Sequence, residues 1–193
     1  EGRPHLPEYI VAHDIELPEG VGRDYVYQET ERGVVGTAPE MDPFVVLPED
    51  ENGVTVKATL VNHAPVFPAF AYRFDTPDGS IVISGDTSPS ENLIKLAQGA
   101  DVLVHEVLHQ PSIEKLVPEN VPNRDEQLYH IYSAHTASTA VGRVARDANV
   151  KKLVLTHLVP ADEIVPDEVW RDHARAGFDG EVIVGKDLME IGV

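Results

Sequence analysis

The stretch Ile81-Val82-Ile83-Ser84-Gly85-Asp86-Thr87 sets the pattern from which the fold of this chain can be inferred. An apolar, β-branched run is followed at once by a turn and a carboxylate. The arrangement recurs where residues 102–104 precede His105-Glu106 and where residues 153–155 precede Thr156-His157. Short runs that are apolar throughout are typical of strands buried on both faces. We therefore expect the polar side chains to converge at one edge of a sheet and to form a hydrolytic metal site.

Strand and helix signals alternate through the rest of the chain, which predicts a layered α/β fold. A hairpin is expected around Thr76-Pro77-Asp78-Gly79, because Pro, Asp and Gly each favour a turn. A helix is expected to begin after Ser88 and to end at Gly99. The remaining expected elements are strands over 54–61, 101–105 and 151–156, helices over 136–148 and from 166, and a closing hairpin over 181–191.

Three segments have less regular patterns. Residues 8–37 alternate loosely and predict strands or a hairpin arm. Residues 38–53 hold three prolines and an acidic turn, so we expect mostly a connection. Residues 108–132 show no sustained period, and we expect a connection that acts as a lid with one short helix.

Composition bounds the chain to one domain and limits its chemistry. With 193 residues, of which 42% are hydrophobic, residues 1–193 are expected to be a single domain or part of one. There is no Cys, so metal ligands must be His, Asp or Glu. No apolar stretch approaches the roughly 20 residues of a membrane-spanning helix. The compartment stays open between cytoplasmic and secreted or periplasmic, because a signal peptide could precede the chain.

The charge is strongly acidic, with 33 Asp and Glu against 15 Lys and Arg and a net charge of -18. A phosphate backbone is bound by clustered Lys and Arg. The charge therefore predicts a small-molecule, ester-type substrate and argues against nucleic acid, tRNA included. A homodimer is left open.

The order of these motifs, with Asn62-His63-Ala64-Pro65 and Ala71-Tyr72-Arg73-Phe74 upstream, resembles the metallo-β-lactamase fold, and within it the ribonuclease Z and arylsulfatase-like branch. The resemblance covers about residues 54–193. It implies an αββα sandwich and a dinuclear site, with two zinc ions or with manganese or iron instead.

The resemblance also implies a role for each candidate residue. His63, ahead of the Ala71-Tyr72-Arg73 strand, would bind one metal, and His157 in Thr156-His157-Leu158-Val159 would bind the second. Asp86 of the Gly-Asp-Thr segment would bridge both metals and so take part in catalysis. Glu106 and His135 would serve in proton transfer, since an imidazole beside a carboxylate can protonate a leaving alkoxide.

One motif of the family is missing. Its members take their other ligands from an N-terminal HxHxDH segment, and no such run occurs in these 193 residues. We therefore expect this chain to be the C-terminal half of the fold, with residues 1–53 as an arm and connection. The absent half would carry the other ligands, and the isolated chain is expected to be inactive.

Each candidate also has an ordinary structural explanation. Asp86 could cap the following helix, His63 could be a loop residue and His157 a structural strand-end residue. Glu106 and His135 could belong to a solvated capping cluster. His105 is expected to be buried and hydrogen-bonded, and His109, in the lid, could touch substrate. The other lid histidine, His130, could do the same.

Departures from the family pattern bear on the substrate. Ribonuclease Z has Ser-Ser-Arg-Tyr or a similar run after its last metal histidine, where this chain has residues 158–162 without a basic group. This favours the arylsulfatase-like or generic esterase side over tRNA processing. The prediction is a hydrolase that cleaves an ester, sulfate ester or phosphodiester with a metal-activated water. The alternatives are a metal-free binding or assembly module, a lactonase and a mononuclear iron oxygenase of the same fold.

Overall fold

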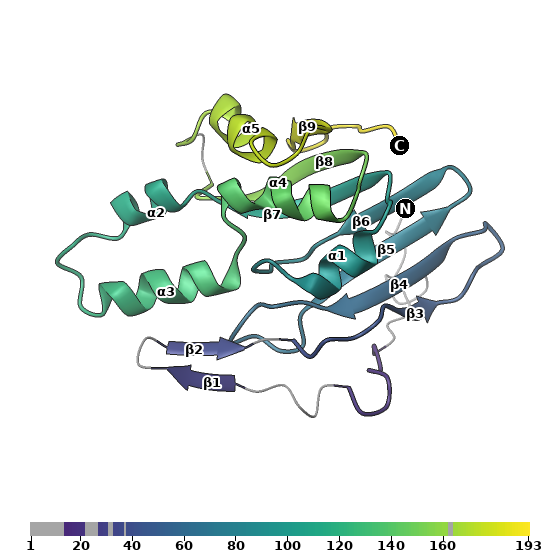
Figure 1. Cartoon of the computed structure of the whole chain (residues 1–193), viewed down its shortest axis with the longest axis horizontal. Coiled ribbons are helices and arrows are strands. Elements are labelled where there is room, and N and C mark those ends of the chain that lie inside the picture. The colour runs from purple at the N-terminus through teal and green to yellow at the C-terminus, as the bar shows by residue number, and fades with distance from the viewer. Residues whose placement is uncertain (1–13, 22–26, 31–32, 37, 162–163) are drawn as a thin grey trace, which may run out of the picture.

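Seven strands form the main sheet, in the order in which they occur along the chain (Figure 1). The computed structural model describes residues 14–21, 27–30, 33–36, 38–161 and 164–193. The strands of the main sheet are β3 (Phe44–Leu47), β4 (Thr55–Leu60), β5 (Phe70–Thr76), β6 (Gly79–Ile83), β7 (Val102–Leu108), β8 (Lys152–Val159) and β9 (Glu181–Val184). The hairpin β5–β6 closes where Thr76 pairs with Gly79, as the turn residues predict.

The sheet has an antiparallel half and a parallel half. Strands β3 to β6 pair antiparallel with their neighbours, and β6 to β9 pair parallel. Residues 81–83, 102–104 and 152–154 lie side by side in register. The carboxyl ends of β6, β7 and β8 therefore meet at one edge, as expected.

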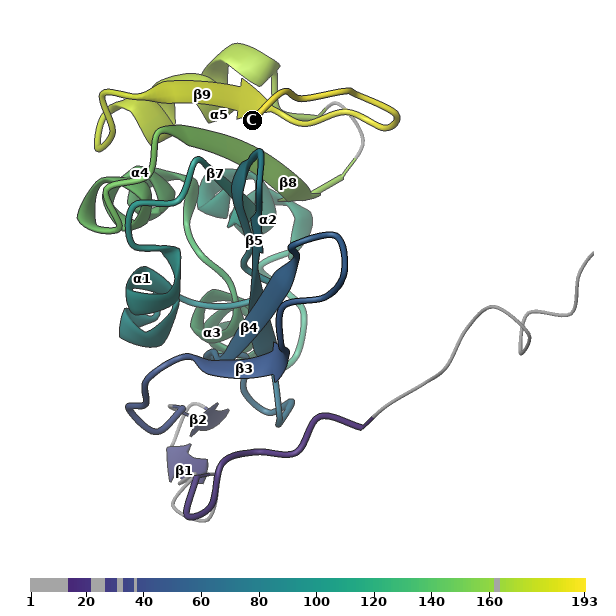
Figure 2. The same cartoon turned by 90° about the vertical axis from the view of Figure 1, so that its right-hand side faces the viewer.

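Three helices cover one face of this sheet, namely α1 (Glu91–Ala97), α4 (Ser138–Asp147) and α5 (Asp167–Arg175). Two others, α2 (Gln110–Leu116) and α3 (Arg124–Ala134), form a separate apolar cluster with Leu108 and Val159 at the ends of β7 and β8. Figure 2 shows α1 and α4 on the same side of the sheet. Buried side chains of α1, α4 and α5, such as Leu96, Val141 and Trp170, pack with Leu103 and Leu153 of the sheet in one apolar cluster. Burial of this apolar area is the main favourable term that holds helices and sheet together.

The opposite face of the sheet is also apolar but is more open to solvent. Ile83 lies between Tyr72 on β5 and Val104 on β7, so the three side chains share that face. Tyr72 and Val104 are half-buried, and Ile83 is 42% exposed. In a sandwich of two sheets, a second sheet would pack against such a face.

The structure corrects two expectations about connections. Residues 38–53, expected to be mostly connection, contain the edge strand β3, which pairs with β4. The strand lies between Pro43 and Pro48, and its Phe44 packs edge-on against Phe70; prolines are tolerated beside an edge strand. Residues 108–132, expected to hold one short helix, contain α2 and most of α3. The eleven residues of α3 bury only two side chains, so they carry no apolar stripe that would mark a helix.

Of the two predictions for the ends of the chain, the strands in the N-terminal arm are confirmed and the C-terminal hairpin is not. The arm contains two paired antiparallel strands, β1 (Tyr27–Thr30) and β2 (Gly33–Gly36), while its residues 8–13, 22–26, 31–32 and 37 lie outside the described part. The closing hairpin over 181–191 is wrong. Residues 181–184 instead pair parallel with β8, and the amide of Gly185 extends that pairing by donating to the carbonyl of Leu155 at 2.8 Å. In the described residues, we find no helix with the length and apolarity needed to cross a bilayer.

Candidate metal centre

The site lies where the carboxyl ends of β6, β7 and β8 meet. One ligand atom each from His63, Asp86 and His135 lies within 4.8 Å of the other two. His157, at the end of β8, adjoins this group, since its ring centroid is 5.8 Å from that of His135. Glu106 is buried next to His135. The structure thus brings together His63, Asp86, Glu106, His135 and His157, the five residues to which the resemblance assigned a role.

Asp86 lies between two histidines. Its Oδ2 atom is 3.9 Å from Nε2 of His63 and 3.6 Å from Nε2 of His157. The helix-capping explanation for Asp86 does not hold, because the N-cap of α1 is Ser90, whose hydroxyl accepts from the amide of Leu93. The carboxylate is therefore free of a capping role and faces imidazoles from two other segments.

The turn before Asp86 depends on Gly85. Its φ angle is +61°, in the left-handed region that favours glycine. A Cβ atom at this position would lie 2.5 Å from the carbonyl oxygen of Phe70. Glycine therefore lets the chain leave β6 close to β5 and direct the next side chain, Asp86, toward the site.

His157 has an irregular backbone. Pairing between β7 and β8 passes from Glu106 with Thr156 to Val107 with Leu158, so His157 is the extra residue of a bulge. Its φ angle is +43°, which is rare for a non-glycine residue. Bulges and strained backbone concentrate at functional sites because they redirect a side chain. Here the side chain that is redirected is the one closest to Asp86, and it is 51% exposed.

Glu106 and His135 form a partly buried pair. Oε2 of Glu106 is 3.4 Å from Nδ1 of His135, and the Glu106 side chain is 1% exposed. Neither atom has a hydrogen-bond partner among the described residues, so the contact is an ion pair between buried groups. The alternative in which both groups are solvated is therefore excluded. The Glu106 carboxylate raises the pKa of His135 above its usual value, against the opposing effect of burial.

His63 has the opposite shift. Burial lowers its pKa, and the nearby charge of His135 lowers it further. A neutral imidazole is the form that binds a metal. The set of neutral imidazole and carboxylate donors fits zinc, manganese or iron, and it contains no thiolate. His135 lies as close to Asp86 and His63 as a ligand would, so the geometry accommodates it either as a ligand or as a proton donor.

The other histidines divide between core and surroundings. His105 is fully buried, and its Nδ1 donates to the carbonyl oxygen of Glu106 at 2.7 Å, as expected. His109 follows β7 and stacks on His173, with its ring 5.5 Å from that of Trp170. It thus lies in a cluster of its own. His130 of α3 is exposed, yet it is close enough for its charge to lower the pKa of His63.

A basic residue beside the site escaped the sequence analysis. A pocket of about 500 Å³ adjoins His157, and Lys186 lines it together with Asp187 and Met189. Lys186 also forms an ion pair of 2.6 Å with Asp167. Residues 158–162 carry no cation, and the segment after β9 supplies one instead. The parallel pairing of β8 with β9 brings the two segments together. No local sequence signal could therefore have shown that Lys186 lies beside the site.

The architecture and site together define the class of this protein. The crystal structure of the metallo-β-lactamase fold protein YhfI from Bacillus subtilis is similar, with a TM-score of 0.53, 23% identity, and coverage of 75% of this chain and 50% of that one. This likeness confirms the metallo-β-lactamase fold.

Curated relatives narrow the class to a family. A Mycobacterium tuberculosis protein named "Putative ribonuclease Z" is 34% identical over 175 residues, which cover 89% of this chain and 75% of that protein. The ribonuclease Z of strain H37Rv has the same identity, and there the match spans 62% of the relative's length. No family model matches the chain. On the identity to these relatives, the chain belongs to the ribonuclease Z family.

This family membership overturns one expectation. We expected nucleic acid not to be a partner, and the relatives are ribonucleases by name. The reasoning from net charge failed because that charge is a sum over the whole chain and does not describe the surface that faces a substrate. The preference for the arylsulfatase-like side stays a prediction.

Proposed function

We propose that this chain forms part of a dinuclear metal-dependent phosphodiesterase that cleaves RNA. The observation that carries the proposal is the position of Asp86 between His63 and His157, beside the Glu106–His135 pair. A carboxylate between two imidazoles suits a bridge between two cations, because each of its oxygens can bind one. The names of the relatives support RNA as the substrate class.

The residues of this chain divide into two groups of roles. His63, Asp86 and His157 would hold the metals, which when bound supply a water activated for attack at neutral pH. His135 would donate a proton to the leaving oxygen of the phosphodiester. Glu106 would hold His135 in its protonated form and in position, which agrees with the raised pKa of His135. His130 and Lys186 stand at the margin of the site, where they could contact the substrate.

We further propose that residues outside these 193 supply the remaining ligands. A catalytic zinc ion takes about three protein ligands. His63, Asp86, His135 and His157 together cannot serve two such ions fully, even with Asp86 shared. The open apolar face around Ile83 offers a surface on which the polypeptide that carries the other ligands could pack.

The test uses the complete protein with an RNA transcript and with bis(4-nitrophenyl) phosphate. A chelator should abolish cleavage of both, and zinc or manganese should restore it. Cleavage that persists in the metal-depleted protein would contradict the proposal.

A second candidate function is hydrolysis of a small uncharged ester, such as a lactone. The observation that favours it is the pocket beside His157, whose lining includes the apolar side chains of Val104, Leu158 and Ile191. The same metal chemistry would serve both reactions. Metal-dependent turnover of lactones without turnover of RNA would favour this candidate over the first.

A further inference from the structure

Three separate segments carry the site, and hydrogen bonds among buried groups connect them. The segments are residues 62–63, residues 85–88 and residues 135–137. Asn62 pairs with Ser88 in an isolated bridge, which joins the first segment to the second. The connection between the second and the third runs through two threonines, Thr87 and Thr136, both with 0% exposure.

Thr136 uses each of its polar groups. Its amide donates to Oε1 of Glu106 at 2.8 Å, and its carbonyl accepts from the amide of Leu108 at 2.8 Å. Its hydroxyl donates to the carbonyl oxygen of Thr87 at 2.7 Å. Thr136 thus joins the segment that carries His135 both to the carboxylate of Glu106 and to the carbonyl of Thr87, the residue after Asp86.

Thr87 completes the connection. Its amide donates to the same Oε1 atom of Glu106 at 3.2 Å, and its hydroxyl accepts from the amide of Asn62 at 3.1 Å. One carboxylate oxygen therefore receives an amide from each of the two segments. The hydroxyl of Thr136 is the one side-chain donor among the described residues that reaches the Thr87 carbonyl, and it closes the ring of contacts.

We propose that Thr136 is a positioning residue whose hydroxyl holds Asp86 in register with His135. The proposal rests on the proposed function, because it assigns Thr136 to the same site. Without the hydroxyl, the Thr87 carbonyl would have to find another donor in a space from which solvent is excluded. The peptide between Thr87 and Ser88 would turn, and the change at Thr87 would shift the neighbouring Asp86 carboxylate. Thr136 itself is fully buried and is not among the proposed metal ligands.

The chain offers a matched control. Thr59 on β4 is also fully buried, and its hydroxyl has no hydrogen-bond partner among the described residues. Thr59→Val and Thr136→Val therefore make the same chemical change at equal burial. They differ in whether a hydrogen bond is lost.

The experiment compares Thr136→Val, Thr136→Ser and Thr59→Val in the complete protein. Zinc affinity is measured by competition with a chromophoric chelator, and exchange of the Thr87 amide is measured by NMR in the metal-free protein. Thr136→Val should weaken zinc binding about 10- to 100-fold, the usual effect of losing a group that orients a ligand. It should also accelerate exchange at Thr87. Thr136→Ser should restore both, and Thr59→Val should change neither.

The two readouts separate the possible failures. Wild-type zinc affinity and wild-type exchange in Thr136→Val would overturn the positioning role while leaving the proposed function intact. If the wild-type protein binds no metal but Thr136→Val still accelerates exchange at Thr87, the proposed function fails and the connection through Thr136 stands. If Thr136→Val does not fold, Thr136→Ser becomes the test, because serine keeps the hydroxyl. Weakened zinc binding in Thr136→Ser would then show that the hydroxyl is not what holds Asp86 in place.

Discussion

The carboxylate of Asp86 lies 3.6 Å from the imidazole of His157, although the two residues follow different strands. Asp86 follows β6 and His157 lies on β8, and β7 lies between these two strands in the sheet. The contact therefore reaches across the carboxyl end of β7. The bulge at His157 and the glycine turn before Asp86 together bring the two side chains toward each other. This relationship is the basis for the first two predictions.

Asp86→Ala in the complete protein should remove at least one metal ion and nearly all hydrolysis while leaving the fold intact. The reason is that Asp86 would bridge two cations but does not cap α1. Metal content by mass spectrometry and secondary structure by circular dichroism check this. The control is Ser90→Ala, which removes the actual cap and should cost about 1 kcal/mol of stability without loss of metal. Full metal content in Asp86→Ala would contradict the assignment.

His135→Ala should retain metal but slow an alkyl phosphodiester far more than a nitrophenyl one. General acid catalysis is worth about 10²–10⁴-fold, and a nitrophenolate needs little protonation to leave. His157→Ala should instead lose metal and slow both substrates alike. Rates on the two diesters, measured with metal content, distinguish the roles. If His135→Ala loses its metals, His135 is a ligand.

The isolated 193-residue chain should bind zinc weakly. Its described ligand set is too small for two complete sites, as argued above. Titration with zinc, followed by calorimetry, measures the affinity and stoichiometry. Two tightly bound ions per isolated chain would refute both the ligand assignment and the need for ligands from elsewhere.

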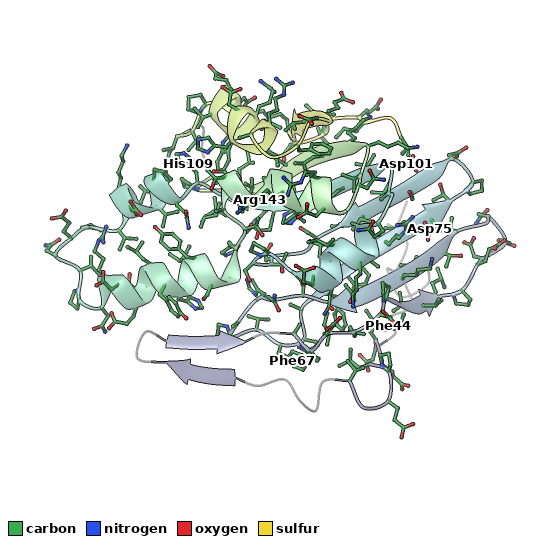
Figure 3. The ribbon with its side chains drawn as sticks, in the orientation of Figure 1. Phe44, Phe67, Asp75, Asp101, His109 and Arg143 are labelled. Carbon is green, nitrogen blue, oxygen red and sulfur yellow. The ribbon has the colours of Figure 1, made fainter. Side chains whose placement is uncertain are left out.

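Asp101→Asn should lower stability near neutral pH and have little effect in strong acid. The hydrogen bond from Lys151, together with those from Ser80, holds the pKa of Asp101 well below its usual value. A carboxyl with a lowered pKa contributes stability above its unfolded pKa of about 3.9, and this is lost as the pH falls through the folded pKa. Asp101 precedes β7 and lies at the opposite end of that strand from His109 (Figure 3).

Melting temperatures of wild type and Asp101→Asn should therefore differ at pH 7 and converge as the pH is lowered below 3.9. The control is Asp147→Asn, since Asp147 is paired with its neighbour Arg146 at the surface and is 48% exposed. It should show no such pH dependence. A constant difference between wild type and Asp101→Asn from pH 7 to strong acid would show that the effect is not due to ionisation.

Gly142→Ala should destabilise the protein, although alanine normally favours a helix. A Cβ atom at this position would overlap the carbonyl oxygen of Ala174, because α4 and α5 cross there in close contact. Such overpacking costs roughly 1–3 kcal/mol. Chemical denaturation measures the loss, with Gly192→Ala as the control, since nothing lies within 4 Å of its added Cβ. An unchanged free energy of unfolding would mean that the helices can separate freely.

The elements found correctly from the sequence are those with a local cause. Residues 81–83, 102–104 and 153–155 are apolar throughout, and that pattern suffices to predict buried strands whose ends meet. The turn at residues 76–79 and the helix after Ser88 also follow from their own residues. The missed elements, β3 and α3, lack such a cause. Phe44 becomes part of a strand only by packing on Phe70, and α3 buries too few side chains to show a period.

The sequence by itself determined the α/β class and the edge of the sheet at which the candidate side chains gather, because apolar runs and the residues that end them are local features. Tertiary structure alone decided that Glu106 receives amides from two segments, that His157 sits in a bulge, and that Lys186 joins the pocket. These depend on which strands pair and in what register. That choice is set by packing among residues far apart in the chain, which no local pattern encodes.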